Sequence, residues 1–498
     1  MIFSAQQVFL CAAAALLALS CARVENKPAA NVSAAASADA PLYAAEEPFV
    51  LAPEDQTEDA LAATRRADAE GGGQTPRLTP QEHMRRAAIY HTNRAFEEAR
   101  NHWRALIERF PSDSNVPAAH FGIGRTLFQE RRYEEALPVF QQLGDKYPNT
   151  VGGRDGFYYV AATLLRLNRF AEAATRYAEY VERFPKGERA EAAHLNIIDS
   201  LREAGRFDDA LPWIERTRSR FPGTPTDVAA LFARLRLDVA RKDWPSALRS
   251  ADELGRLNIP KAANTSAAEV AYLRAFSLEM SGQKEQAARA YQGIADGVNS
   301  YYGARATERL EKMGGQAKTA GRAREERVLG DVRKASGNYP APYREVIVRE
   351  AKRHKLDPRL VLSIMRAESS FNPRAKSGAG ARGLLQMTPD MAAKYATAAR
   401  ITVGNEEDLF RPEINIPVAS AYLAELDRMF PDLPEAVAAS YNGGEDNAAR
   451  WVRRAIHDDP AIFAAEVGFN ETKEYVSRVM SNYRAYKFLY TDDLKPRR

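Results

Sequence analysis

A repeat with a period of 37 residues runs through the first half of the chain. An aromatic residue recurs at Phe96, Tyr133, Phe170, Phe207 and Trp244. Alanine follows each of them three residues later, at Ala99, Ala136, Ala173, Ala210 and Ala247. An aromatic–proline pair keeps the same spacing, at Phe110-Pro111, Tyr147-Pro148, Phe184-Pro185 and Phe221-Pro222. A fixed period of this length indicates a stack of similar units, in which each unit covers the apolar face of its neighbour.

Each unit is expected to be a pair of helices. An aromatic residue at the start of a helix, with a small residue one turn later, favours close packing of two helices. The aromatic–proline pair then ends the second helix. The repeat resembles the tetratricopeptide family, whose usual period is about 34 residues. The register slips after Ala247, but residues 267–313 keep the helical pattern and Ala287 fits as a sixth match.

The residues before the repeat predict export. Val8 to Leu19 form an apolar run that is too short for a comfortable membrane span and is typical of a signal peptide. The run ends in Leu17-Ala18-Leu19-Ser20-Cys21, which resembles a bacterial lipoprotein cleavage box with Cys21 as the lipidated residue. Ordinary signal cleavage and a misplaced start codon are the alternatives. Residues 22–80 show no apolar periodicity and predict a flexible tether, with a helix around residues 57–69 as the alternative.

Composition limits the classes of function that fit. A chain of 498 residues, 45% of them hydrophobic, is expected to form two or three globular domains. Its net charge of +4 is slight for this length and does not indicate a nucleic-acid-binding surface. Both cysteines, Cys11 and Cys21, precede the expected folded part, so neither a disulfide nor a cysteine metal site is expected there. The seven histidines show no metal-ligand spacing, and we expect no metal and no organic cofactor.

One carboxylic acid lies on an apolar helix face. The stretch that starts at Pro358 predicts an amphipathic helix in which Val361, Ile364, Met365 and Glu368 share one side. Burial favours the neutral form of a carboxylic acid and raises its pKa toward the range that a general acid needs. On the residues alone, a salt-bridged structural acid is the more common explanation of Glu368.

A glycine-rich loop follows this helix. The helix is expected to end at Asn372-Pro373, because the residue before proline avoids the α region. The loop then ends in Leu384-Leu385-Gln386, where Gln386 can both donate and accept hydrogen bonds. Glu368-Ser369 together with this loop are similar to the "ES…GLMQ" signature of the soluble lytic transglycosylases, lysozyme-like enzymes that cleave bacterial peptidoglycan.

Two further motifs follow in the order of that family. Tyr441-Asn442 ends a predicted helix where the family has "AYNAG", and residues 469–476 (FNETKEYV) resemble its "PFxETxxYV". On the residues alone, Tyr441 also fits a core tyrosine, and Glu471 an acid favoured by a helix dipole. The resemblance implies that a set of residues contacts the glycan around the acid Glu368: Ser369, Gln386, Met387, Tyr441, Asn442, Glu471 and Tyr475.

The resemblance also implies cleavage without water. Hydrolytic glycosidases need two carboxylates about 5–10 Å apart. The candidates for a second one, Asp390 and Glu413, are acidic and nearby in the sequence but stand in no matching motif. In the resembled family one glutamate protonates the oxygen between N-acetylmuramic acid and N-acetylglucosamine. The same glutamate then takes the proton of the muramic 6-hydroxyl, which closes a 1,6-anhydro ring. Glu368 is expected to play both roles, in a carbon–oxygen lyase. A lysozyme-type muramidase on the same fold, or a non-catalytic repeat scaffold that binds glycan, are the alternatives.

The expected architecture is mainly α, with a helical-repeat superhelix followed by a lysozyme-like catalytic domain. The expected order is a signal peptide at 1–21, a tether at 22–80, repeats at 81–316, a linker at 317–338 and the catalytic domain at 339–498. The repeats are expected either to hold glycan or a partner protein, or to act as a spacer. Ala22 after Cys21 resembles the pattern of outer-membrane lipoproteins, so an exported, periplasmic protein with a lipid anchor is expected.

Overall fold

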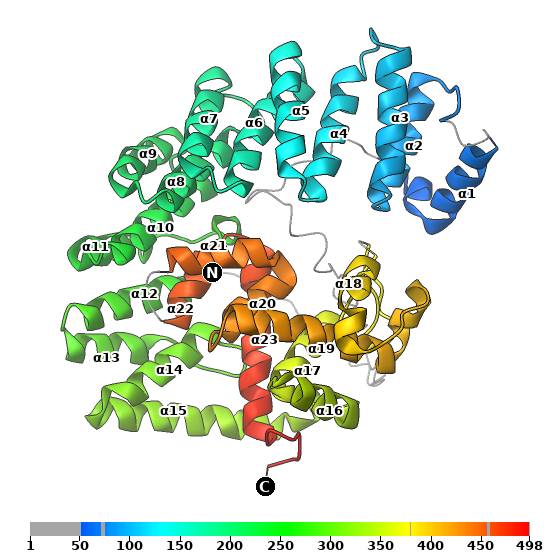
Figure 1. Ribbon diagram of the computed structural model, residues 1–498. Helices are drawn as coiled ribbons and strands as arrows, with labels where there is room; N and C mark the ends of the chain where they lie inside the picture. Colours follow the sequence, from blue (N-terminus) through cyan, green and yellow to red (C-terminus); the bar gives the residue numbers. More distant parts are fainter. Residues whose placement is uncertain (1–50, 71–74, 379, 456–458, 498) are drawn as a thin grey trace, which may run out of the picture. The chain divides into compact units, whose positions relative to one another are not determined.

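The computed structural model describes residues 51–70, 75–378, 380–455 and 459–497 (Figure 1). Within these ranges the chain is helical, with isolated β-bridges and no strand, so the predicted mainly α class is confirmed. None of the helices described there is both long and apolar enough to cross a membrane. The expected signal peptide, Cys21 and the tether up to residue 50 lie outside the described residues.

The repeats form helix pairs in chain order. The pairs are α2 (Pro80–Thr92) with α3 (Phe96–Arg109), α4 (Val116–Gln129) with α5 (Tyr133–Lys146), α6 (Val151–Arg166) with α7 (Phe170–Arg183), α8 (Ala190–Glu203) with α9 (Phe207–Arg220), α10 (Pro225–Ala240) with α11 (Trp244–Leu254), and α12 (Ala267–Met280) with α13 (Lys284–Gly293). Each repeated aromatic residue begins the second helix of its pair. Each repeated alanine, Ala287 included, is 0% exposed. The predicted helix pairing is therefore confirmed.

A left-handed turn joins the two helices of each of the first five pairs. The residue two before each repeated aromatic has a positive φ angle: Arg94 (60°), Arg131 (60°), Asn168 (58°), Gly205 (70°) and Lys242 (60°). We call these five residues the turn row. The left-handed conformation costs a residue other than glycine roughly 1–2 kcal/mol. Four of the five turn-row residues nevertheless carry a side chain.

Two segments expected to lie outside the repeats and the catalytic domain contain helices. Within the expected tether, α1 (Glu58–Ala69) follows the short η1 (Pro53–Gln56) and is held by Asp68, which accepts hydrogen bonds from Tyr90 Oη (2.5 Å) and His102 Nε2 (3.0 Å). The alternative helix near 57–69 was thus the correct one. The expected linker at 317–338 is likewise helical over most of its length, since it contains α15 (Gly315–Lys334), which packs on α14 (Tyr301–Met313). Its Arg324 is buried and donates a hydrogen bond of 2.6 Å to the carbonyl oxygen of Ile294.

The remaining helices bring the conspicuous motifs together. They are α16 (Arg344–His354), α17 (Pro358–Ser369), α18 (Pro389–Ala399), α19 (Pro412–Met429), α20 (Pro434–Gly443), α21 (Glu445–Arg454), α22 (Pro460–Glu466) and α23 (Asn470–Leu489), with the short η2 (Lys261–Ala263), η3 (Ser336–Asn338) and η4 (Glu406–Phe410). Helices α17 and α20 both pack against α23. Side chains that are separated by about a hundred residues in the sequence therefore meet around α23.

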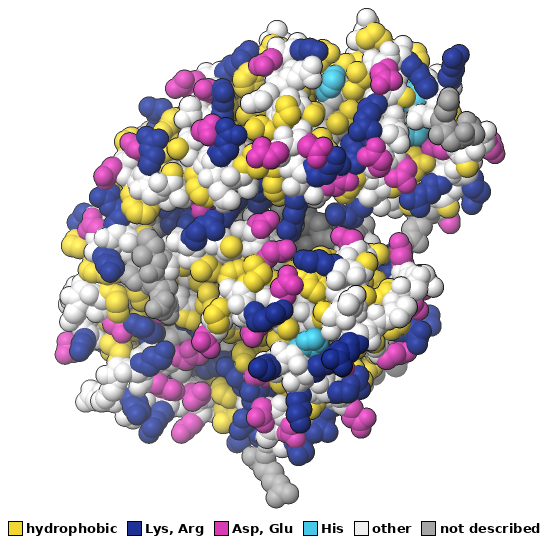
Figure 2. Space-filling model, in the orientation of Figure 1, with side chains coloured by type: hydrophobic (Ala, Val, Ile, Leu, Met, Phe, Trp, Pro, Cys, Tyr) yellow, Lys and Arg dark blue, Asp and Glu magenta, His cyan; other side chains and the backbone are white. Residues whose placement is uncertain are grey.

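Buried charge and a shared apolar core connect these helices to the repeats. The buried carboxylate of Glu466 on α22 forms ion pairs with Arg202 of α8 (2.5 Å), Arg236 of α10 (3.1 Å) and Arg454 of α21 (3.2 Å). One apolar core runs from Val228 to Leu494. On the face shown in Figure 2, Lys and Arg side chains are interspersed with Asp and Glu and do not gather in one patch, in keeping with the slight net charge.

Candidate active site

Helix α17 carries Glu368 on the buried face that the sequence predicts. Asp357 caps the start of the helix, because its Oδ1 accepts a hydrogen bond of 2.8 Å from the backbone N–H of Arg359. Val361, Ile364 and Met365 are at most 1% exposed and Glu368 is 6% exposed. The expected shared face is therefore confirmed, and it encloses one carboxyl group among aliphatic side chains.

Burial raises the pKa of Glu368 to about 7. Two groups of α23 act in the opposite direction and lower this pKa: Tyr475 Oη, which donates a hydrogen bond of 2.7 Å to Oε1, and the positive charge of Arg478. The negative charge of Glu471 raises it further. Near neutral pH the Glu368 carboxyl group is thus divided between its protonated and ionised forms, as a group that both gives and takes a proton requires.

Arg478 is a functional residue that the sequence reasoning missed. It lies one turn beyond Tyr475, with its guanidinium 5.5 Å from the centre of the Tyr475 ring. Glu471, Tyr475 and Arg478 are spaced at i, i+4 and i+7, so they share one side of α23. That spacing was a signal for Arg478 in the sequence.

Helices α20 and α23 are joined beside this face. Thr472 Oγ1 donates a hydrogen bond of 2.6 Å to Oδ1 of Asn442, and Asn442 also forms a hydrogen bond with Glu471. Partial burial raises the pKa of Glu471, while that bond with Asn442 and the charge of Arg478 lower it. Asn442 and Glu471 therefore lie together, as the motifs imply.

Three of the expected site residues hold the backbone of the loop after α17. Ser369 Oγ donates to the carbonyl oxygen of Leu384 (2.7 Å), and Tyr441 Oη donates to that of Leu385 (2.6 Å). Gln386 Nε2 donates to the carbonyl oxygens of Gly383 (2.8 Å) and Ala375 (3.0 Å). The hydroxyl hydrogens of Ser369 and Tyr441 are thus engaged by backbone, so both residues position the loop.

Asn415 of α19 completes this support and was also missed. Its side chain is fully buried; Oδ1 accepts from the N–H of Leu385 (2.9 Å), and Nδ2 donates to the carbonyl oxygens of Arg382 and Leu409 (both 2.9 Å). Gly383 lies in this contact with a φ of 80°, and a Cβ there would be 2.1 Å from the carbonyl oxygen of Leu409. Only glycine fits at this position.

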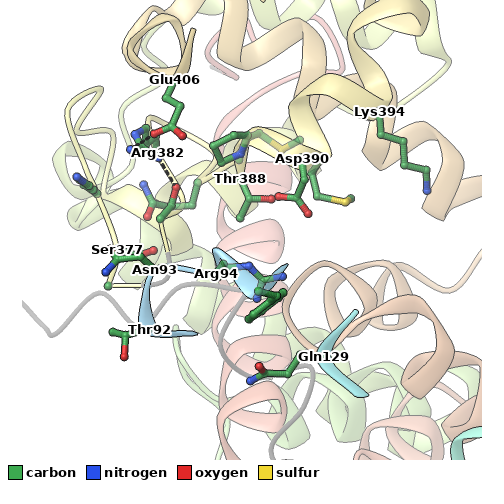
Figure 3. Close-up of a pocket in the computed structure, with 18 of the residues that line it drawn as sticks. Thr92, Asn93, Arg94, Gln129, Ser377, Arg382, Thr388, Asp390, Lys394 and Glu406 are labelled. Atoms are coloured by element: carbon green, nitrogen blue, oxygen red, sulfur yellow. Dashed lines mark hydrogen bonds and ion pairs between the residues drawn. The ribbon is translucent and has the colours of Figure 1, made fainter. Parts of the chain in front are cut away.

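Two cavities are lined by residues of this site. The first, of about 1650 Å³, is lined by Gln386, Met387 and Tyr441 among others (Figure 3). The second, of about 1280 Å³, is lined by Ser370, Phe371 and Arg478 among others. Glu368 itself lines neither of the two. Glu368 does interact electrostatically with one lining residue of each cavity. Its charge raises the pKa of Tyr441, which lines the first, and the charge of Arg478, which lines the second, lowers the pKa of Glu368.

The two other acids considered from the sequence differ from Glu368. Asp390 is exposed at the first cavity. Glu413 is exposed and forms an ion pair of 2.9 Å with Arg411. Among the side chains that the structure describes, Glu471 is the carboxylate whose charge acts on Glu368. No group of three or more His, Cys, Asp or Glu side chains in the described ranges is arranged to hold a metal ion.

Comparisons with known proteins agree with this organisation. Residues 345–463 match the family described as transglycosylase SLT domain, and residues 86–149 and 161–225 match tetratricopeptide repeats. The putative soluble lytic murein transglycosylase of Haemophilus influenzae is 34% identical over 155 residues, which are 30% of this chain and 25% of that protein. The soluble lytic murein transglycosylase of Escherichia coli K12 is 28% identical over 156 residues, 31% of this chain and 24% of that protein. The matches thus span about a quarter of these relatives.

A solved structure of an inactive mutant of the lytic transglycosylase Slt from Pseudomonas aeruginosa aligns with a TM-score of 0.47 and 19% identity. The alignment covers 85% of this chain and 84% of that one. The family matches place the Glu368 helix, the glycine-rich loop and Tyr441 in one domain, and most of the helix pairs in another kind of unit. The chain carries a transglycosylase SLT domain preceded by tetratricopeptide repeats.

Proposed function

We propose that this protein is a peptidoglycan lytic transglycosylase, a lyase that cleaves the β-1,4 bond between N-acetylmuramic acid and N-acetylglucosamine and leaves 1,6-anhydro ends. The observation that carries the proposal is the buried Glu368, whose pKa of about 7 and contact with Tyr475 suit a group that exchanges protons at neutral pH. The SLT domain and the names of the relatives support the same substrate. Such an activity would contribute to remodelling or recycling of the cell wall.

Glu368 would act twice in the reaction. In its protonated form it gives its proton to the bridging oxygen as the bond to C1 of the muramic sugar breaks. The resulting carboxylate then takes the proton of the 6-hydroxyl, whose oxygen attacks C1 and closes the anhydro ring. The attack is intramolecular, so orientation of the sugar replaces the activation of a water molecule. The hydrogen bond from Tyr475 and the charge of Arg478 would stabilise Glu368 in its ionised form between the two steps.

The remaining site residues would hold the sugar and the loop in place. Ser369, Gln386 and Tyr441 brace the loop through its carbonyl oxygens, and Met387 adds an apolar lining to the first cavity. Asn442 and Glu471 form a polar pair at the junction of α20 and α23. We infer that the glycan runs past Glu368 between the two cavities, since residues that interact with Glu368 line each of them.

Mass spectrometry of muropeptides tests this proposal. Peptidoglycan is digested with the wild type, with Glu368→Gln and with the control Glu413→Gln, which changes an exposed acid of the same domain. We expect products one water lighter than reducing-end sugars from the wild type and the control, and none from Glu368→Gln. Reducing-end products would instead indicate a muramidase that places water with a second carboxylate such as Glu471. No products from the folded wild type would refute catalysis and favour a glycan-binding scaffold.

We also propose that the protein is exported and lipidated at Cys21, on the strength of the apolar run and the box that ends there. Expression in a bacterial host with labelled palmitate tests this. The label should enter the wild type and not Cys21→Ser, and the wild type should fractionate with the outer membrane. Unlabelled wild type in a soluble fraction would refute the anchor.

A further inference from the structure

The first cavity has a wall that belongs to the repeats. Figure 3 shows Thr92, Asn93, Arg94 and Gln129 on one side and Arg382, Thr388, Asp390 and Lys394 on the other. The first group comes from the turns α2–α3 and α4–α5, and Arg66 of α1 also lines the cavity. Helices far from the SLT domain in the sequence thus line the same cavity as Gln386 and Tyr441.

Two residues of the turn row, Arg94 and Arg131, line this wall. Two members of the row pair with α21: Arg131 forms ion pairs of 3.3 Å with both Glu445 and Asp446, and Asn168 Oδ1 accepts a hydrogen bond of 3.4 Å from Arg453. Arg94 has the same position one repeat earlier. It lines the cavity as Arg131 does, but among the residues that the structure describes no acidic side chain pairs with it.

Arg94 is held in place despite the cost of its backbone conformation. Its φ angle is 60°, a conformation that Gly205 adopts in the same row without strain. Its guanidinium lies 5.1 Å from the centre of the Phe96 ring, which gives it a defined direction. Arg66 is exposed at the same wall and has no ion-pair partner in the described part of the chain. Two guanidinium groups are therefore free to bind a ligand.

The other wall carries charges of both signs: Lys376, Arg382 and Lys394 line it, and so do acidic side chains. Asp390 and Glu407 line the cavity there, and neither side chain forms an ion pair with a described residue. The cavity thus offers the guanidinium groups of Arg94 and Arg66 on the repeat side, and both carboxylates and cations on the SLT-domain side. A ligand that carries both carboxylate and ammonium groups is complementary to it, whereas a glycan of neutral sugars is not. A guanidinium binds a carboxylate through two parallel hydrogen bonds, which makes arginine suited to this task.

We propose that Arg94 and Arg66 bind carboxylate groups of the peptide stems attached to the glycan, so that the repeats select peptide-bearing peptidoglycan. This inference rests on the proposed function for the identity of the substrate. In peptidoglycan that bears its stems the free carboxylates lie on the peptides, because the lactyl carboxyl of the muramic sugar forms the amide bond to the stem and the hydroxyl and acetamido groups are neutral. The repeats would then contribute to substrate recognition rather than act only as a spacer.

Binding measurements with matched variants test the proposal. Full-length Glu368→Gln protein, which keeps ligand intact, is combined with Arg94→Gly or with the control Lys242→Gly. Both changes remove one positive charge at a turn-row position whose φ suits glycine, but Lys242 lines neither of the two large cavities. The probes are muropeptide fragments with their stems and the same fragments after amidase has removed the stems, which leaves only the lactyl carboxylate on each muramic sugar. Isothermal titration gives Kd and so separates binding of stem carboxylates from binding of the sugar carboxylate.

We expect Arg94→Gly to weaken binding of the stem-bearing fragment about tenfold, the value of one charge-assisted hydrogen-bonded contact, and to leave the stemless fragment unchanged. Arg94→Lys should restore part of the loss, and Lys242→Gly should show none. If Arg94→Gly bound the stem-bearing fragment as tightly as its parent does, the proposal would be overturned. It would also be overturned if Arg94→Gly weakened binding of the stemless fragment as much as binding of the stem-bearing one. Failure of the wild type to release anhydro products would refute the proposed catalysis, while these binding data would still decide the role of Arg94.

Discussion

Replacing Glu368 with glutamine is expected to stabilise the protein at alkaline pH while it abolishes turnover. In the unfolded chain this carboxyl group has the ordinary pKa of 4.5, and in the folded protein burial raises it to about 7. Between these values the folded protein holds a proton that the unfolded chain has released. The contribution of Glu368 to stability therefore falls as the pH rises from about 4.5 to about 7, and then stays constant.

The size of this effect follows from the two pKa values. The gap between 4.5 and about 7 corresponds to about 3 kcal/mol, at roughly 1.4 kcal/mol for each tenfold change in the proton dissociation constant. Glutamine has the same shape, carries no charge, and keeps an oxygen that accepts the hydrogen bond of Tyr475. The variant should thus exceed the wild type by about 3 kcal/mol above pH 8, and by little near pH 4.

Urea unfolding of both proteins from pH 4 to pH 9 measures this difference, because the other titrating groups cancel in the comparison. Glu413→Gln is the control. A hydrogen bond from its own backbone and one from Arg411 lower the pKa of Glu413, so its small effect should have the opposite sign. A difference between Glu368→Gln and the wild type that does not change with pH would refute a raised pKa of Glu368. A variant that is less stable at pH 9 would refute it as well.

Three further changes test other parts of the structure. Tyr475→Phe removes a hydrogen bond that lowers the pKa of Glu368, so the alkaline fall of the pH–rate profile should move to higher pH; a fall at the wild-type pH would contradict this. Gly383→Ala places a Cβ 2.1 Å from a carbonyl oxygen at a φ of 80°, and should cost about 1–3 kcal/mol in thermal unfolding and reduce activity; wild-type values would show that the loop adjusts. Glu466→Ala removes a buried carboxylate from three arginines that then share only Asp199 and Glu203, and should cost about 3–5 kcal/mol in urea unfolding; a loss below about 1 kcal/mol would show that Asp199 and Glu203 suffice to balance these charges.

The repeats could be predicted from the sequence because their signals are local. An aromatic residue that begins a helix, and an alanine one turn later, act within a single helix pair, and all six of these alanines are fully buried. The same holds for α17, where the spacing of Val361, Ile364, Met365 and Glu368 places them on one side before any partner is known. The spacing of apolar residues shows which face of a helix is buried, and it does so whichever element packs against that face.

Segments rich in charge were misjudged for a physical reason. The stretch of α15 was noted in the sequence only as a charged linker, and charged residues usually face water. Its Arg324 instead points inward and satisfies the carbonyl oxygens of Gln292 and Ile294. Helix α1 depends in the same way on Asp68, whose partners Tyr90 and His102 lie in other helices. A buried charge is stable only when such partners are present. The partners lie elsewhere in the chain, so the sequence of the segment itself does not show which residues they are.

The sequence by itself determined the helical class, the repeat register and an acid on an apolar helix face, because each depends on spacings within one or two helices. It also brought the motifs to attention through their resemblance to a family. Only the tertiary structure decided that Tyr475 and Arg478 reach Glu368, that Asn415 holds the loop, and that Arg94 lines a cavity with the SLT domain. These contacts join residues up to several hundred positions apart, and distance in space, rather than order along the chain, governs both pKa and binding.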